Sequence, residues 1–246
     1  NREVNTVSVL LGNGKGAWAQ HVDYATGDPP AALAIGDFNG DGKQDIVTAN
    51  VNANSVSVLL GVGDGALGTA VQYPVGEGPM AVTVDDFDDN GTADVATANM
   101  YGHSVSILLG AGNGTFANIV DYPAGSYPDE IVSGDFNTDG KRDLITNGGP
   151  TRASVLLGAG KGKFMAPTSV PSDGGDSSGA LALGDLNGDG NQDLIVGRGT
   201  GRWTPGAFGV LFGVGDGSFL PMMDYPAGAA RVVAAADLDG EARREL

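Results

Sequence analysis

The sequence of 246 residues combines a strong negative charge with an unusual amount of glycine. It carries 30 Asp and Glu against 13 Lys and Arg, for a formal net charge of -17, and 42 residues are Gly. The absence of Cys excludes disulfides and cysteine-ligated zinc or iron–sulfur sites. The pI near 4.1 and the lack of a basic cluster argue against a nucleic-acid partner. No apolar run approaches the ~18 residues of a membrane span.

The predicted elements of one repeat are clearest between residues 33 and 75. Four short runs, β-branched or alternating in polarity, lie at 33–37, 45–50, 55–60 and 70–75, bounded by Gly, Asn and Pro. No stretch has a convincing helical period, so each run is predicted to be a β-strand. Between the third and fourth runs, GVGDG supplies residues that accept positive φ, which predicts a tight hairpin.

This unit recurs along the chain with a period close to 49 residues. Its acidic segments begin at Asp37, Asp86, Asp135, Asp185 and Asp237, which are spaced by 49, 49, 50 and 52 residues. Four strands in a repeat of roughly 40–50 residues are typical of a β-propeller blade. The sequence therefore predicts an all-β propeller of four-stranded blades. We expect residues 1–246 to form a single propeller domain that starts and ends inside a blade.

Two further motifs run in phase with the acidic segments. The motif VSVLLGxGxG, with an aromatic or apolar residue after it, starts at Val7, Val56, Val105, Ala153 and Phe208. Its aromatic residues recur at one repeat position, which predicts a role in the core between sheets for Trp18, Phe116, Phe164 and Phe219. A Tyr-containing motif closes four of the repeats, as DYATG, QYPVG, DYPAG and DYPAG. In the remaining repeat, SVPSD stands in its place from Ser169.

The acidic segments carry oxygen-bearing side chains at positions 1, 3, 5 and 9 of a nine-residue loop, with Gly at position 6. Ca²⁺ takes about six to eight oxygen ligands, and a tight loop with acids at alternate positions points them inward. Including main-chain carbonyls at position 7, the predicted ligand sets are Asp37, Asn39, Asp41, Lys43 and Asp45; Asp86, Asp88, Asn90, Thr92 and Asp94; Asp135, Asn137, Asp139, Lys141 and Asp143; and Asp185, Asn187, Asp189, Asn191 and Asp193.

The alternative interpretation is that these segments are ordinary Asp/Asn/Gly turns, which are common. A plain turn does not require three or four oxygens at fixed offsets, and so many acids in nine residues would repel one another without a cation. An EF-hand would need a bidentate Glu at position 12 and flanking helices, whereas Thr48, Thr97, Thr146 and Val196 stand there. Mg²⁺ is disfavoured by its stricter octahedral geometry.

A fifth loop keeps acids at positions 1, 3, 5 and 9 but has Ala242 in place of the glycine. A left-handed turn is unfavourable for Ala, which predicts a weak or empty site. Its acids are Asp237, Asp239, Glu241 and Glu245. The cofactor expected is therefore calcium, about four ions with a fifth weak site.

Taken together, the acidic loop, VSVLLGxGxG and the YPxG motif resemble the FG-GAP/VCBS repeat family over nearly the whole chain. That family includes the calcium-binding propeller of integrin α subunits and many secreted bacterial proteins. The resemblance implies blades around an axis, calcium loops on the hairpin between strands one and two, and an extracellular setting, secreted or at the cell surface. Family members are commonly seven-bladed, so five blades or a fragment of a seven-bladed ring both remain possible, and a longer polypeptide could carry further domains.

Candidate partner-binding residues lie on the loops opposite the acidic ones, where propellers usually bind partners. Among the loops between strands two and three, RGTGRWTPGAF is the longest, and Trp and Arg dominate binding hot spots. Trp203 could equally pin this loop onto the neighbouring blade. The ligand-binding residues expected are Tyr101, His103, Arg152, Arg198, Arg202 and Trp203.

Three functions remain open at this stage. The first is a non-catalytic, calcium-binding adhesion or recognition module, integrin-like or lectin-like, for an extracellular protein or carbohydrate. The second is the propeller of a secreted polysaccharide lyase or hydrolase, although no catalytic set of residues can be built. The third is a structural spacer in a surface protein.

Overall fold

The computed structural model describes residues 1–148, 152–171, 179–198, 207–226 and 233–235. The chain divides into two compact units. Unit 1 comprises Asn1–Asp86 and Asn90–Asp121, and unit 2 comprises Phe87–Asp89 and Tyr122–Leu246. None of the described segments forms a helix with the length and apolar character that crossing a bilayer requires.

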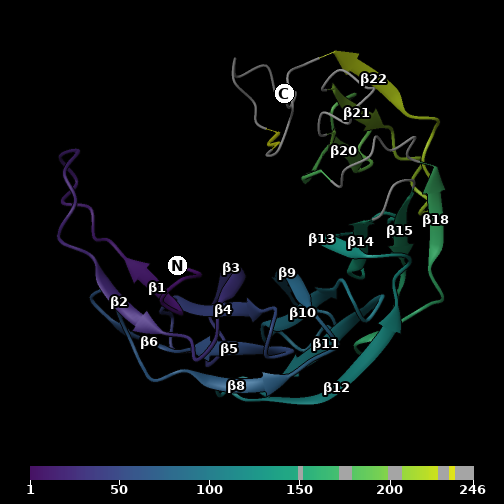
Figure 1. Cartoon of the computed structure of the whole chain (residues 1–246). Helices are drawn as coiled ribbons and strands as arrows, with labels where there is room; N and C mark the ends of the chain where they lie inside the picture. The colour runs from purple at the N-terminus through teal and green to yellow at the C-terminus, as the bar shows by residue number, and fades with distance from the viewer. Residues whose placement is uncertain (149–151, 172–178, 199–206, 227–232, 236–246) are drawn as a thin grey trace. The chain divides into compact units, whose positions relative to one another are not determined.

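Unit 1 is built around two four-stranded antiparallel sheets (Figure 1). The order of strands in the first is β3 (Pro30–Gly36), β4 (Asp45–Asn50), β5 (Ser55–Leu59) and β8 (Val71–Pro74). The second contains β9 (Pro79–Asp85), β10 (Asp94–Asn99), β11 (Ser104–Gly110) and β12 (Phe116–Pro123). Strand β9 contacts β3 and β4, so the first strands of successive sheets are neighbours. Two-stranded sheets join β1 (Thr6–Val9) to β2 (Val22–Ala25) and β6 (Gly61–Gly63) to β7 (Ala66–Leu67).

Unit 2 repeats this plan. Its first sheet has the order β13 (Pro128–Gly134), β14 (Asp143–Gly148), β15 (Arg152–Leu156) and β18 (Thr168–Pro171). The second has the order β19 (Leu181–Gly184), β20 (Asp193–Arg198), β21 (Ala207–Leu211) and β22 (Met223–Pro226), and β19 contacts β13. A small hairpin joins β16 (Gly158–Gly160) to β17 (Lys163–Phe164).

The prediction of an all-β fold made of four-stranded propeller blades is confirmed. The second expected run coincides with β4, and the other three overlap β3, β5 and β8. Every residue of β4, β5 and β10 is buried, because these strands are flanked in their sheets and covered on both faces. Burial on both faces explains why these strands consist mainly of small and β-branched residues.

The glycine-rich segment after the third strand forms the expected hairpin. In the first sheet Gly61 pairs with Leu67, and Gly63, Asp64 and Gly65 have φ of 100°, 53° and 74° at the turn. This left-handed backbone is readily adopted by Gly and tolerated by Asp, which accounts for part of the glycine content.

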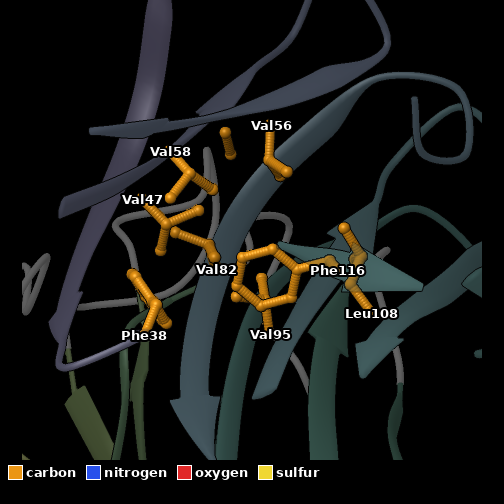
Figure 2. Packing of buried hydrophobic residues seen from close by; sticks show 9 residues of the cluster. Phe38, Val47, Val56, Val58, Val82, Val95, Leu108 and Phe116 are labelled. Carbon is orange, nitrogen blue, oxygen red and sulfur yellow. The ribbon is translucent and has the colours of Figure 1, made fainter. Parts of the chain in front are cut away.

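Apolar side chains fill the space between successive sheets. Figure 2 shows part of this cluster in unit 1, where Phe38 and Phe116 meet edge to face with ring centroids 5.4 Å apart. In unit 2, Phe136 packs against Phe219 at 6.0 Å. The Phe after the leading Asp of one acidic loop thus packs on the aromatic residue of the next repeat. This confirms the expected core role of Phe116, Phe164 and Phe219, with Phe219 only partly buried.

The prediction for Trp18 is wrong, because its side chain is 70% exposed. Phe116, Phe164 and Phe219 each pack against the Phe in the acidic loop of the preceding repeat, one loop before their own. No acidic loop precedes Trp18 in this sequence, so its indole has no such partner and lies over Gly12 instead.

Buried polar side chains fasten the second and third strands to the connection that enters each blade. Asn50 receives a hydrogen bond from Thr48 at 3.0 Å and donates to Ser57 at 2.8 Å. Ser57 in turn donates to the carbonyl of Thr26, upstream of β3, at 2.5 Å. Thr97, Asn99 and Ser106 repeat the network in the second sheet. These hydrogen bonds satisfy groups that would otherwise be costly to bury.

The partial burial of Glu130 predicts that the stability difference between wild type and Glu130→Gln depends on pH. Glu130 lies half-buried in β13, where desolvation, with a smaller effect of Asp129, raises its pKa above 4.5. The folded state therefore favours the protonated form, and the contribution of Glu130 to stability falls as pH rises above 4.5. Glu130→Gln should be more stable than wild type at neutral pH by about a few tenths of a kcal/mol, because solvent screens the partly exposed group.

Urea unfolding of both proteins at a series of pH values checks this expectation. The advantage of Glu130→Gln should disappear below the unfolded-state pKa. An advantage that persists unchanged at acidic pH would contradict it.

Candidate metal sites

The four complete acidic loops all join the first strand of a sheet to the second. Loop 1 (37–45) lies between β3 and β4, loop 2 (86–94) between β9 and β10, loop 3 (135–143) between β13 and β14, and loop 4 (185–193) between β19 and β20. In each loop the last residue is also the first residue of the second strand. The loops therefore have the same place in each sheet.

The aspartate at position 1 folds each loop around its own carboxylate. Asp37 accepts hydrogen bonds from the amides of Gly40 and Gly42 at 2.8 Å and from Asp41 at 3.2 Å. Asp185 accepts the corresponding three at 2.7, 3.2 and 2.9 Å. These bonds hold positions 4 to 6 close to the leading aspartate.

Two positions of each loop have left-handed backbone. The sequence predicted this for position 6, where Gly42, Gly91, Gly140 and Gly190 have φ between 78° and 87°. Position 4 is left-handed as well, with Gly40, Asp89, Thr138 and Gly188 between 56° and 77°. A left-handed position 4 is hard to predict from the sequence, because only two of the four loops have glycine there, Gly40 and Gly188.

The aspartate at position 9 has a role that sequence reasoning missed. Asp45 accepts a hydrogen bond at Oδ2 from the amide of Phe38 at 2.8 Å and one at Oδ1 from Gly61 at 2.6 Å. Asp143 and Asp193 make the same pair of bonds, and all four position-9 aspartates are 0% exposed. The carboxylate thus ties the acidic loop to the glycine hairpin of the same sheet, about 16 residues further on.

The first glycine of each hairpin makes this contact possible. A Cβ on Gly61 would lie 2.2 Å from the carbonyl oxygen of Gln44, and one on Gly158 would lie 2.3 Å from that of Arg142. Gly110 and Gly213 are equally close to Ala93 and Gln192. Only a residue without a side chain fits between the loop and the hairpin.

Burial and neighbouring groups divide the loop carboxylates into two kinds. Desolvation raises the pKa of Asp143 and Asp193 at position 9, although backbone hydrogen bonds oppose it. At position 5, the hydrogen bond from the Lys43 side chain lowers the pKa of Asp41, and the Lys141 side chain does the same for Asp139. The Lys43 ammonium lies 2.9 Å from the Asp41 carboxylate, and the Lys141 ammonium lies 2.7 Å from that of Asp139.

Loop 2 brings three carboxylates together. Asp86, Asp88 and Asp94 each offer an oxygen within 4.8 Å of the others, the one such cluster in the part of the chain that the structure describes. Oδ1 of Asp88 is buried and has no hydrogen-bond partner. In loops 1 and 3 the position-5 carboxylate is bonded to lysine instead, and in loop 4 Asp189 accepts a hydrogen bond from Asn187.

These donors fit a hard divalent cation. An unpaired, buried carboxylate oxygen beside two further carboxylates is costly unless a positive charge compensates it. Asn90 and the carbonyl of Thr92 would add the neutral oxygens that Ca²⁺ accepts. The residues predicted as ligands in loop 2 could therefore jointly coordinate such an ion.

Other predicted site residues are placed less completely. The fifth-loop residues Asp237, Asp239, Glu241 and Glu245 lie outside the described residues, as do Arg202 and Trp203.

The ligand-binding residues that are described fall in both units. Tyr101 and His103 belong to the turn after β10 in unit 1, and Tyr101, 53% exposed, packs over Gly78. In unit 2, Arg152 begins β15 and Arg198 ends β20. The ligand-binding set therefore stays a prediction.

Comparison with protein families gives a consistent result along the chain. The model of the FG-GAP-like repeat matches residues 1–48, 37–97, 86–146 and 135–196, and that of the FG-GAP repeat matches residues 178–216. Three of the matched segments, 37–97, 86–146 and 135–196, run from one acidic loop to the next. No curated protein matches the chain.

Two solved structures share the fold. One is a functionally unknown protein from Desulfotomaculum acetoxidans, with 19% identity and a TM-score of 0.64 over 92% of this chain. The other is described as a candidate 6-phosphogluconolactonase from Bacteroides fragilis, with 18% identity and a TM-score of 0.64 over 91% of this chain. The chain spans 66% and 65% of their lengths.

Proposed function

The chain belongs to the FG-GAP repeat family, and on that basis we propose that it is a calcium-binding β-propeller domain that recognises an extracellular protein or carbohydrate. The observation that carries the calcium part is the buried, unpartnered Oδ1 of Asp88 beside the carboxylates of Asp86 and Asp94. A bound Ca²⁺ would offset two of the three negative charges and give the buried oxygen a partner.

An extracellular setting follows from the chemistry of such sites. Calcium-binding modules outside cells work at dissociation constants of about 10⁻⁴–10⁻³ M, where free calcium is abundant. The lysines bonded to Asp41 and Asp139 reduce the negative charge of loops 1 and 3, which favours weak sites of this kind. We therefore expect the chain to work secreted or at the cell surface.

The recognition part is tested by binding without turnover. Glycan and protein arrays should be probed with the chain in calcium and in EGTA. We expect the chain to bind either glycans or proteins on the arrays when calcium is present, and to release no reaction product over time. Release of product from a polysaccharide would instead support the lyase or hydrolase alternative.

A pair of neighbouring aspartates gives a matched test of the calcium site. Asp88→Asn should remove one of about four bound ions, because it takes a charge from the three-carboxylate cluster. Asp89→Asn is the control, since Asp89 is exposed at position 4 and Asn tolerates its φ of 60°. Calorimetric titration of both variants with calcium gives the stoichiometries.

Equal calcium stoichiometry for Asp88→Asn, Asp89→Asn and wild type would contradict the proposed site. Circular dichroism in calcium checks that both variants fold.

A further inference from the structure

The fourth copy of the Tyr-containing motif is the one that lacks its tyrosine, and the structure shows what the ring does elsewhere. Tyr73 of β8 packs edge to face on Phe116, with ring centroids 5.4 Å apart. Tyr122 of β12 packs on Phe164 in the same way, at 5.6 Å and an interplanar angle of 73°. Each tyrosine lies on the outer strand of one sheet and covers the hairpin Phe of the next.

In β18 the equivalent residue is Val170. The register establishes this equivalence, because Val170 pairs with Ala153 as Tyr73 pairs with Val56 and Tyr225 with Phe208. The Phe that a tyrosine would cover here is Phe219, which is only partly buried. A change from Tyr to Val removes the whole ring.

A cavity of about 290 Å³, partly open to solvent, lies at this place in unit 2. Val170 and Phe219 both line it, together with Leu157, Gly217 and the rim residues Thr168 and Asp216. For comparison, an apolar cavity of about 150 Å³ in another protein binds benzene. The space is therefore large enough for an aromatic ring with a polar substituent.

The two junctions are otherwise built alike. A Cβ on Gly217 would touch Leu157 at 2.8 Å, and one on Gly114 would touch Leu60 at 2.7 Å, so hairpin and strand approach each other equally closely. The hydroxyl of Tyr122 lies 3.4 Å from the carbonyl oxygen of Gly162, to which it can donate. Gly217 is the equivalent glycine in the hairpin of residues 213–217, so its carbonyl is the corresponding acceptor by position.

We propose that this cavity, the Val170–Phe219 pocket, binds a phenolic ring, edge to face on Phe219, with its hydroxyl donating to the Gly217 carbonyl. The molecule itself fills the equivalent place twice with a phenol. A free phenol and a tyrosine side chain of a peptide share this chemistry. The acidic rim residue Asp216 disfavours an anionic substituent beside the hairpin.

p-Cresol is the direct probe, because it is the side chain of tyrosine without its backbone. Titration of the calcium-loaded chain, followed by the methyl NMR signals of Val170 and Leu157, should give a dissociation constant on the order of 1 mM. Toluene, which lacks the hydroxyl, should bind several-fold more weakly. N-acetyltyrosinamide distinguishes a free phenol from a peptide tyrosine as the ligand, since it binds only if the pocket admits a ring attached to a peptide backbone.

Two reciprocal variants make the test specific. Val170→Tyr should fill the pocket with its own ring and weaken p-cresol binding at least tenfold. Tyr73→Val should create an equivalent pocket on Phe116 and a second p-cresol site. Absence of shifts at Val170 with about 10 mM p-cresol, or unchanged binding by folded Val170→Tyr, would overturn the proposal. If neither variant folds, the test rests on whether p-cresol shifts the NMR signals of Val170 and Leu157 in the wild-type chain.

Discussion

Removing calcium with EGTA is expected to lower the midpoint of thermal unfolding by more than about 10 °C. At calcium concentrations about 100 times the dissociation constant, one site that exists only in the folded state contributes about 2.7 kcal/mol. For a chain of this size, 1 kcal/mol shifts the midpoint by about 2–4 °C. Several loops acting in the same folded units therefore add to a large shift, which differential scanning calorimetry measures directly.

The physical origin of this effect is charge. Each of the four loops places at least three aspartates within nine residues, and the position-9 carboxylate of each is fully buried. Without a cation these groups repel one another and bear the cost of desolvation. Magnesium at the same concentration is the control and should stabilise much less, because it demands octahedral geometry and keeps its waters. An unchanged midpoint in millimolar calcium would contradict the expectation.

Gly61→Ala is expected to destabilise the first sheet by about 3 kcal/mol or more. The added Cβ would lie 2.2 Å from the carbonyl oxygen of Gln44, and that oxygen belongs to backbone that cannot rotate away. Either loop 1 or the hairpin must move, and this movement breaks the hydrogen bond that the Gly61 amide donates to Asp45. Overpacking of this kind costs about 1–3 kcal/mol, and the stranded buried carboxylate adds to it.

Gly68→Ala is the matched control in the same repeat. Its nearest neighbour would be the carbonyl oxygen of Leu60 at 3.4 Å, an ordinary contact. Chemical denaturation in saturating calcium compares the two variants with wild type. The account is wrong if Gly61→Ala unfolds at the same denaturant concentration as Gly68→Ala.

The repeat made much of the fold predictable. Strands such as 45–50 are bounded by Gly and Asn and recur with their neighbours at a fixed period, so their number and order per blade follow from local sequence. The place of the acidic loops between first and second strands follows from the same register.

What sequence reasoning missed depends on contacts between distant residues. The bond of Asp45 to the Gly61 amide and the close approach of Gly61 to Gln44 join segments 16 or 17 residues apart. Nothing in GxGxG distinguishes a glycine required by a close approach from one required by positive φ. Trp18 shows the same limit, since its repeat position predicts a core role but its side chain is 70% exposed.

The negative charge noted at the outset also has a structural explanation. The predicted ligand positions of the first four loops hold 12 of the 30 acids, so a substantial part of the negative charge is concentrated where cations would bind. Calcium binding at these loops would reduce the net charge by two units per ion. The acidity is thus organised by the repeat rather than spread as a solvated surface.

The most direct measurement is the number of calcium ions bound per folded chain, by equilibrium dialysis with elemental analysis at millimolar free calcium. The account predicts about four, with loss of one ion in Asp88→Asn and none in Asp89→Asn. A folded chain that binds no calcium at this concentration would contradict the central claim that the acidic loops are metal sites.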